Sequence, residues 1–333
     1  MGPGSQGTGR PAAGPGTAVS LGQVITAIAG GVGAARFLRG LARVVAPEEI
    51  TAVVNTGDDL VLHGLHISPD IDTVLYTLSG RNDDERGWGL RDESWRTMDA
   101  LARLGGESWF RLGDLDLATH LYRTERLAQG ATLSEVTAEL AAAQGVGLRI
   151  LPMSDGPVRT RVTLLDGPEV AFQDYFVRRR HDVALSAVRF DGADSAAPAP
   201  GVLEAIELAD VVVVCPSNPI VSIGPVLAVA GIEAALAARR DRVVAVSPIV
   251  AGAALKGPAD RMLLELGHPA SVVGVAGLYA AFAGTLVVDD ADVHLAAEVE
   301  EAGMRCIVAP TVMHSVDDAA ALAAVVLGAP VGR

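Results

Sequence analysis

The sequence is poor in residues that mark several classes of protein. Of its 333 residues only 2 are cysteines, Cys215 and Cys306, and each ends an apolar run. This content argues against a disulfide framework, and we expect both thiols to be buried as small apolar side chains. Aromatic residues make up only 4% of the chain, and lysine occurs once, at Lys256. Lys256 is therefore the single candidate for a catalytic lysine.

Long apolar runs and an excess of positive charge are also missing. The longest apolar run, near 243–255, covers about a dozen residues and is broken by Pro248 and Gly252, whereas a membrane span needs about 20. A formal net charge of −14 creates no field that attracts phosphates. We therefore expect neither a nucleic acid nor a membrane as partner. No basic segment followed by an apolar core marks a signal peptide, so we expect a cytoplasmic location.

Half of the residues are apolar, which excludes intrinsic disorder. Short β-branched runs alternate with helical patterns along much of the chain. This alternation predicts an α/β fold with a mostly parallel, Rossmann-like sheet and helices on both faces. The expected strands are 24–29, 51–55, 211–215, 243–246, 271–275, 285–288 and 305–308.

The chain divides into three parts by composition. Residues 1–20 are rich in Gly, Pro and Ala without periodicity, and we expect a disordered tail. The α/β core is expected over 21–68 and 148–333. Between these, 69–147 shows helical spacing and few strand signals, which indicates a helical insertion. An Asp-Gly pair between two alternating runs predicts a β-hairpin over 159–177.

A glycine-rich segment, Gly30-Gly31-Val32-Gly33, lies between the first strand and the helix expected at 34–45. Free backbone N–H groups and the helix dipole favour an anion there, and glycines let a phosphate approach closely. The segment is not a Walker loop, because no Gly-Lys-Ser/Thr follows. It is not a full dinucleotide fingerprint either, since Arg36 stands where the third glycine belongs. It predicts a phosphate site, and the alternative is a tight turn into a helix.

Acidic residues follow the second strand. Asp58 and Asp59 end the segment Asn55-Thr56-Gly57-Asp58-Asp59, and Asp70 and Asp72 come soon after. Because ligands bind at the carboxyl ends of parallel strands, these acids should lie beside the glycine segment. Carboxylates next to a phosphate loop predict a Mg²⁺ site. As alternatives, Asp58 and Asp59 are turn residues and Asp70 caps a helix beginning at 71.

Three further loops follow expected strands. Ser154-Asp155 and Ser217-Asn218 combine short polar side chains with prolines, which suits hydrogen bonding to a base or ribose. Lys256 precedes a helix and suits a phosphate. Plain turns and a solvated lysine are the alternatives. No Gly-x-Ser-x-Gly, Cys-x-x-Cys or His-Glu-x-x-His motif occurs, which argues against serine-hydrolase, dithiol and zinc-peptidase chemistry.

Taken together and in this order, the segments resemble the 2-phospho-L-lactate transferase and phosphoenolpyruvate transferase family of coenzyme F420 biosynthesis. The resemblance extends from about 24 to about 327. It rests on Gly30-Gly31-Val32-Gly33-Ala34-Ala35-Arg36, Asn55-Thr56-Gly57-Asp58-Asp59, Pro69-Asp70-Ile71-Asp72-Thr73, Gly87-Trp88-Gly89, Leu112-Gly113-Asp114-Leu115-Asp116-Leu117-Ala118-Thr119-His120, Pro152-Met153-Ser154-Asp155, Pro216-Ser217-Asn218-Pro219 and Lys256-Gly257-Pro258.

The resemblance implies a Mg²⁺-dependent transferase. Its donor is a guanosine diphosphate esterified to enolpyruvate or L-lactate, and the sequence does not distinguish these two. Its acceptor is the ribityl hydroxyl of Fo (7,8-didemethyl-8-hydroxy-5-deazariboflavin), and GMP is released. GDP or GMP would bind as a product-like ligand. The resemblance also implies a homodimer.

The same resemblance assigns roles to residues. Asp72 and Asp59 are the catalytic candidates. The metal candidates are Asp58, Asp59 and Asp72, and the acceptor candidates are Asp72, Arg91 and Arg111, partly from the helical insertion. The donor candidates are Gly30, Gly31, Val32, Gly33, Ser154, Asp155, Ser217, Asn218 and Lys256. Family members carry a second aspartate where this chain has Gly156, which bears on base selectivity.

Two other readings compete with the transferase. A sister family of nucleotide-sugar-binding regulators shares the glycine segment and the parallel sheet and has no transferase activity. The Gly-Trp-Gly and Leu-Gly-Asp segments of the insertion argue against that family. A nicotinamide oxidoreductase is disfavoured by the missing third glycine and by Asn55, which stands where an acid is expected.

Overall fold

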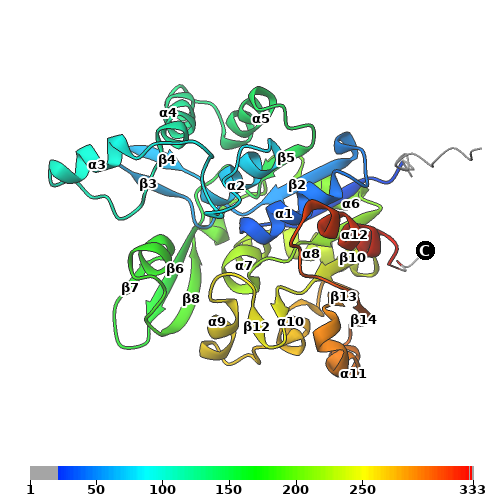
Figure 1. The fold of residues 1–333 in the computed structure, drawn as a ribbon. Coiled ribbons are helices and arrows are strands. Elements are labelled where there is room, and N and C mark those ends of the chain that lie inside the picture. The colour runs from blue at the N-terminus through cyan, green and yellow to red at the C-terminus, as the bar shows by residue number, and fades with distance from the viewer. Residues whose placement is uncertain (1–21, 330, 332–333) are drawn as a thin grey trace, which may run out of the picture.

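The computed structural model describes residues 22–329 and 331. The tail expected at 1–20 lies outside this range. At the centre is a seven-stranded sheet in the order β14-β13-β10-β9-β1-β2-β5, and every neighbouring pair is parallel (Figure 1). The α/β class is thereby confirmed. Its strands are β1 (Ile25–Ala29), β2 (Ile50–Val54), β5 (Arg149–Pro152), β9 (Val211–Val214), β10 (Val243–Val246), β13 (Thr285–Val288) and β14 (Arg305–Val308).

The central strands are apolar on both faces, because helices cover both sides of the sheet. All four valines of β9 are buried. Alternate residues of β1 enter different cores: Ile25 packs with one cluster and Ile28 with the other. The first core is completed by α1 (Gly31–Leu41), α2 (Pro69–Leu78), α5 (Leu133–Ala143) and α12 (Val316–Leu327). The second core is completed by α6 (Val202–Leu208), α8 (Ile232–Ala238), α9 (Ala259–Glu265) and α10 (Val272–Tyr279).

One expected strand is wrong: 271–275 begins helix α10. The Ser271 side chain accepts a hydrogen bond from the Gly274 N–H (3.4 Å) and caps the helix. The helix is buried on nearly every side, so its apolar run has no visible helical period. A short apolar run of this kind does not distinguish a buried strand from a buried helix.

The expected hairpin is confirmed, and it belongs to a small three-stranded antiparallel sheet. Strands β6 (Arg159–Leu164) and β7 (Glu169–Ala171) form it, and a π-helix (Asp174–Arg178) replaces the end of its predicted second half. Strand β8 (Leu185–Asp191), which the sequence analysis did not predict, pairs with the other edge of β6.

Between α2 and β5 the chain is largely helical, with α3 (Arg96–Arg103) and α4 (Asp114–Ala128). A short hairpin, β3 (Leu60–Leu62) and β4 (Leu65–Ile67), precedes it and projects with α3 to one side, above the sheet of β6, β7 and β8 (Figure 1). Helix α2 itself packs closely on α1 and shares its core. The remaining elements are α7 (Gly224–Ala228), α11 (Ala296–Glu301), the two-residue strands β11 (Ile249–Val250) and β12 (Ala253–Ala254), a π-helix (Pro219–Ile223) and the 3-10 turns Pro47–Glu49, Ala193–Ser195, Arg240–Arg242 and Asp290–Leu295.

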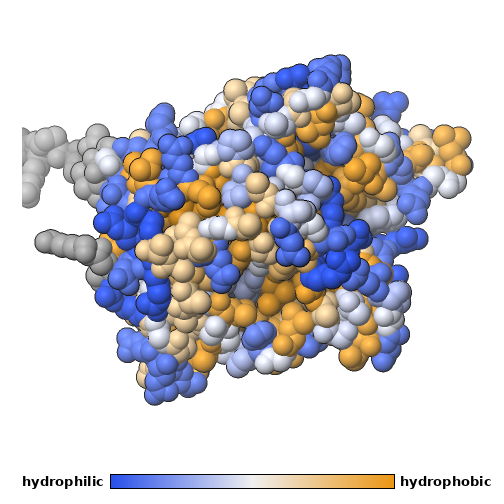
Figure 2. Space-filling model, turned by 180° about the vertical axis from the view of Figure 1, so that it is seen from behind, coloured by the Kyte–Doolittle hydropathy of each residue, from blue (hydrophilic) through white to orange (hydrophobic). Residues whose placement is uncertain are grey.

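Among the described residues, no single helix is long and apolar enough to cross a membrane. One bent pair, Pro219–Ala228 with Ile232–Ala238, passes the test of length and composition, with 93° between its halves. Seen from behind, the surface mixes apolar and hydrophilic residues, and apolar residues gather in the hollow near the middle of this face (Figure 2).

Candidate functional site

The glycine segment forms the turn from β1 into α1. Gly30 is the N-cap of the helix, and Gly31 has a φ of +70°, a conformation that favours glycine. A Cβ on Gly30 would lie 2.7 Å from the Ser222 Cβ and 2.9 Å from an Asp70 carboxylate oxygen. A Cβ on Gly33 would fall on the Pro216 carbonyl oxygen. Gly30 and Gly33 thus let neighbouring loops approach the start of α1, and Gly31 provides the turn.

Asp70 lies against this turn. Helix α2 begins at Pro69 with Ser68 as its N-cap, so the alternative that Asp70 caps the helix is wrong. The Asn55 side-chain amide donates to Asp70 (2.9 Å) and to Asp58 (3.4 Å), and it links the end of β2 to the first turn of α2. The Gly31 backbone N–H also acts on the Asp70 carboxylate and lowers its pKa, against the larger effect of burial. Asp70 therefore lies directly against the glycine segment. It was one of the carboxylates expected to form the Mg²⁺ site, although the resemblance assigned it no role.

Three of these acids have raised pKa values, and of these Asp58 and Asp70 are buried and Asp59 is half-buried. Burial raises the pKa of Asp59 to about 7 and that of Asp70 to about 6. Burial, followed by the charges of Asp70 and Asp59, raises the pKa of Asp58 well above its ordinary value. The positive charge of Arg159 lowers the pKa values of Asp58 and Asp59, but burial has the larger effect. Arg159 forms no ion pair with them in the described part of the chain.

One oxygen of this group has no partner. Asp59 Oδ2 accepts a hydrogen bond from the Ser68 hydroxyl (2.8 Å), whereas its Oδ1 is buried without a hydrogen bond. A buried acceptor without a donor is costly. A divalent cation with oxygen ligands fits this donor set, because it would offset the negative charge that burial disfavours. Asp58 and Asp70, which Asn55 links, are the residues in place to hold it, and the charge of Asp59 acts on the same group.

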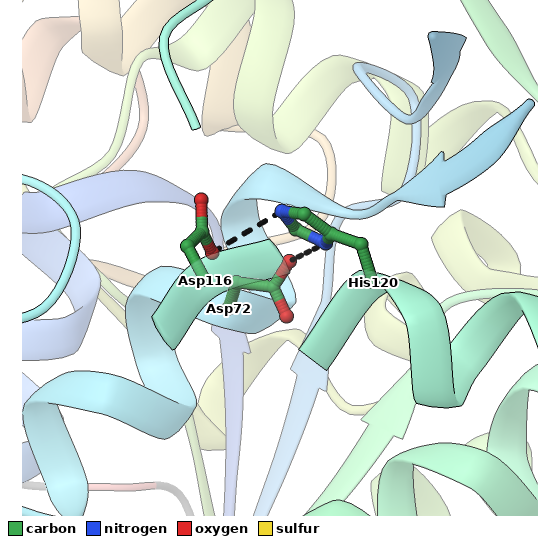
Figure 3. A group of neighbouring side chains, drawn as sticks. All are labelled: Asp72, Asp116 and His120. Carbon is green, nitrogen blue, oxygen red and sulfur yellow. Dashed lines mark ion pairs between the residues drawn. The ribbon is translucent and has the colours of Figure 1, made fainter. Parts of the chain in front are cut away.

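Asp72 belongs to a different group. It projects from α2 toward α4, and Arg123, which is 0% exposed, binds both of its carboxylate oxygens, one of them at 3.1 Å. His120 lies between two acids: its Nδ1 is 3.7 Å from Asp72 and its Nε2 is 3.2 Å from Asp116 (Figure 3). The Tyr76 hydroxyl donates to Asp116 at 2.7 Å. These five residues form one buried network between α2 and α4.

Three members of the network have potential metal-ligating atoms within 4.8 Å of one another: Asp72, Asp116 and His120. However, the Arg123 guanidinium already neutralises Asp72 and lies 3.2 Å from the His120 ring. A metal ion would face this buried cation at close range. We therefore interpret the group as an ion-pair network that holds α4 against the first turn of α2. Burial raises the pKa of Asp116, but His120, Tyr76 and Arg123 together outweigh burial and leave that pKa lowered.

The sequence analysis did not single out Asp116, His120 or Arg123 as site residues. The signal was present in their spacing. Asp116 and His120 are four residues apart, and Arg123 follows His120 by three. On a helix such residues share one face, so the spacing predicts a polar face on α4 directed at another element.

The four polar residues predicted to hold guanosine all make internal hydrogen bonds. The Ser154 hydroxyl donates to Ala197 O (2.7 Å). Asp155 Oδ1 accepts from the Ser134 N–H and hydroxyl, both at 2.7 Å. The Ser217 hydroxyl donates to Gly30 O (2.8 Å). Asn218 Oδ1 accepts from the Ile220 N–H (2.9 Å) and caps the following π-helix. Ser217 thus contacts the glycine segment directly, whereas Ser154 and Asp155 lie beyond β5 at the edge of the sheet. Gly156 donates its N–H to the Ser154 hydroxyl (3.0 Å).

Two predicted acceptor residues lie away from the carboxylates. Arg91 donates to Gly80 O, and Arg111 pairs with Asp99 (3.2 Å) and lies over the Trp95 ring, 4.9 Å from its centroid. Within residues 22–329, neither arginine contacts Asp72. Trp88 and Trp95 stand 5.6 Å apart between their ring centroids, so Arg111 belongs to an aromatic cluster.

A small cavity lies beside the glycine segment, between α1, α2 and the loop before α3. It is lined by Val32, Arg36, Thr73, Tyr76, Thr77, Asn82, Asp84, Gly87, Trp88 and Gly89. The Lys256 ammonium approaches from the opposite side and donates to Gly87 O (3.1 Å). Val32 and Lys256, two of the predicted donor residues, therefore lie at or beside this cavity. Arg36 and Trp88 also line it, although neither was assigned a role.

Comparison with known proteins was informative over nearly the whole chain. Residues 25–321 match the family model described as 2-phospho-L-lactate transferase CofD. The protein named phosphoenolpyruvate transferase from Kitasatospora aureofaciens is 48% identical over 305 residues, covering 90% of this chain and 95% of that protein. The protein of the same name from Mycolicibacterium smegmatis is 41% identical over 313 residues, covering 90% and 96%.

Among solved structures, protein BH3568 from Bacillus halodurans aligns with a TM-score of 0.60 and 18% identity, covering 92% of this chain and 99% of that one. At this identity the likeness shows the fold alone. The sequence matches carry the assignment, and the chain belongs to the 2-phospho-L-lactate transferase (CofD) family.

Proposed function

We propose that this protein transfers a phosphoenolpyruvyl or 2-phospho-L-lactyl group from a guanosine diphospho donor to the ribityl hydroxyl of Fo, releasing GMP, in coenzyme F420 biosynthesis. The family and the names of the relatives support a transferase of this kind, and those names favour the enolpyruvyl donor. One structural observation carries the chemistry: the buried Asp58 and Asp70 carboxylates meet at the glycine turn through Asn55.

The proposed reaction is a substitution at phosphorus. The hydroxyl oxygen of Fo forms a bond to the phosphorus that bears the three-carbon acid, and the bond from that phosphorus to the oxygen of GMP breaks. GMP leaves with the electron pair, and a base takes the hydroxyl proton. The N–H groups at the start of α1 would bind the diphosphate. The protein contributes mainly positioning and charge stabilisation to such a reaction.

The three acids with raised pKa values divide into two roles by their contacts. Asn55 contacts Asp58 and Asp70 and not Asp59, so we assign Asp58 and Asp70 to Mg²⁺. When bound, Mg²⁺ supplies positive charge to the phosphate oxygens of the donor. Asp59 has a raised pKa and a free buried oxygen, which suits acceptance of the hydroxyl proton. Asp72, which we predicted as a metal, catalytic and acceptor residue, instead positions α2 through Arg123.

The aromatic cluster supports an acceptor site in the loop before α3. Trp88 is 44% exposed and lines the cavity. The Arg86 guanidinium lies over both the Trp88 ring and the Trp95 ring, at 4.7 and 4.8 Å from their centroids. Exposed indoles of this kind provide flat surfaces on which a planar deazaflavin stacks. We extend the proposal to a cytoplasmic homodimer, on the family resemblance.

The test is transfer to Fo measured by mass spectrometry. The protein would be mixed with Mg²⁺, Fo and each guanosine donor separately. We expect a product with the added mass of phosphoenolpyruvate or phospholactate, and Asp70→Asn should lower turnover by about 10²-fold or more. Asp241→Asn is the matched control, because the Asp241 side chain is 78% exposed and its ion pair is with Arg240 rather than with a residue of the acidic group. Absence of product with both donors would refute the function.

A further inference from the structure

Two positive side chains approach each other beside the cavity. Arg36 comes from the middle of α1, and Lys256 from the loop between β12 and α9. Burial first, and the nearby Arg36 guanidinium second, lower the pKa of Lys256. Like charges brought together destabilise each other, so their proximity needs a reason.

Neither side chain is neutralised by a carboxylate. Among residues 22–329 and 331, the Arg36 guanidinium makes no hydrogen bond or ion pair, and Lys256 hydrogen-bonds only to the neutral Gly87 carbonyl oxygen. Arg36 acts electrostatically on Asp84, but that carboxylate hydrogen-bonds to Asn82 (2.9 Å) and Arg39 (3.4 Å). The chain has 40 acidic and 26 basic residues. The acid that lines the cavity, Asp84, is thus engaged by other side chains, and two adjacent cations that pair with no carboxylate of the described residues in so acidic a chain indicate an external anion.

The approach of Lys256 depends on the shape of the opposite loop. Gly87 has a φ of +79°, and a Cβ there would fall on the Lys256 ammonium. The glycine therefore allows the lysine to reach the loop that carries Trp88. Arg36 lines the same cavity as Gly87 and Val32. The two cations thus border a hollow that opens next to the glycine segment.

The pair lies apart from the expected diphosphate position. Arg36 follows Gly31 by five residues, which places it about 7.5 Å further along the helix axis. The free N–H groups of α1 are confined to its first turn, so a diphosphate held there leaves Arg36 for another anionic group. The donor of the proposed reaction carries one such group, the carboxylate of its three-carbon acid.

We propose that Arg36 and Lys256 bind the carboxylate of the three-carbon acid of the donor. The assignment rests on the proposed function. A planar guanidinium binds a carboxylate through two parallel hydrogen bonds, and the ammonium of Lys256 supplies a second charge. The buried acids on one side of the glycine segment and this pair on the other would together hold the reacting phosphorus between them.

The experiment compares a ligand that has the acid with one that lacks it. For Arg36→Gln and Lys256→Met, the KM of the guanosine diphospho donor would be measured in the transfer assay, and the Kd of GDP by calorimetry with Mg²⁺. Loss of a hydrogen bond to a charged group should raise the donor KM about tenfold to a hundredfold, with the GDP affinity nearly unchanged. Lys256→Arg should retain most of the donor affinity, because it keeps the charge.

Arg43→Gln is the matched control. It removes one positive charge from the exposed turn that follows α1, and it should leave both constants near wild type. Equal losses for GDP and donor would contradict the carboxylate assignment and place the pair on the diphosphate. Unchanged constants in both variants would overturn any anion role. A wild-type protein that neither binds GDP nor forms product would instead refute the proposed function.

Discussion

The ion pair between Arg123 and Asp72 should be among the interactions of this fold that cost most when one partner is removed. Arg123 is fully buried, and both oxygens of Asp72 accept its hydrogen bonds. Burial lowers the pKa of Arg123, but the charge and hydrogen bonds of Asp72, together with Tyr76 and Asp59, outweigh burial and leave that pKa raised. Replacing Arg123 with Met keeps most of the volume and leaves the Asp72 carboxylate buried without its cation.

The cost follows from that unpaired charge. Removal of one partner from a buried ion pair costs about 3–5 kcal/mol, against a total stability of about 5–15 kcal/mol. Unfolding entropies near 2.1 cal/mol/K per residue, over about 310 described residues, sum to about 0.65 kcal/mol/K. Arg123→Met should therefore lower the Tm by about 5–8 °C.

Differential scanning calorimetry of a double-mutant cycle measures the pair directly. Asp72→Asn removes the negative charge that Arg123→Met leaves buried without a partner. The free energy of unfolding of the double variant should therefore be higher than the two single losses, added together, predict. Arg126→Met is the control, one turn further along α4. Its ion pair with Glu139 is partly exposed (2.7 Å) and should contribute about 1 kcal/mol or less. The reasoning fails if Arg123→Met lowers the free energy of unfolding no more than Arg126→Met does. It also fails if the losses of Arg123→Met and Asp72→Asn simply add in the double variant.

Further predictions concern the glycine segment and the surrounding acids. Without divalent cations, the free energy of unfolding should fall as the pH rises from about 4 to about 7, because Asp59 and Asp70 have folded-state pKa values of about 7 and about 6, above the ordinary 3.8. Mg²⁺ should then raise the Tm more at pH 8 than at pH 5, and an equal shift at both would contradict a site among these acids. Gly31→Val should abolish GDP binding in calorimetry, since valine disfavours a φ of +70° and its side chain would stand in the phosphate approach; wild-type affinity would exclude that role. Trp88→Ala should raise the KM for Fo and not that for the donor, and equal KM values for Fo in both proteins would remove the indole from the acceptor site.

The parallel sheet was predictable because its strands are continuous β-branched runs between helices. Such runs are what burial on both faces requires. The same reasoning failed for 271–275, since a largely buried helix has the same composition as a buried strand. Strand β8 was missed although Val188 and Phe190 alternate with exposed Arg189 and Asp191. Only one of its seven residues is buried and the alternating stretch is short, so its signal is weak.

The site was predictable to the level of segments and less so to the level of side chains. The order of segments placed the acids beside the glycine turn. It did not separate Asp70, which contacts Gly31, from Asp72, which points to α4 two residues later. On a helix, positions two apart face different neighbours. The choice between them depends on the elements packed against α2, and a local sequence does not contain that information.

The distribution of charge around the glycine turn bears on how a chain of net charge −14 would bind a donor that is itself strongly anionic. The overall field repels such a ligand. Local groups must therefore supply the attraction, and three kinds of group are in place: the N–H groups at the start of α1, the Arg36 and Lys256 pair, and the buried acids, which become attractive to phosphate only with a divalent cation. Because the acids repel the donor when ionised and empty, we expect donor affinity to depend steeply on Mg²⁺. We expect that dependence to weaken in Asp58→Asn, where one of the repelling charges is gone.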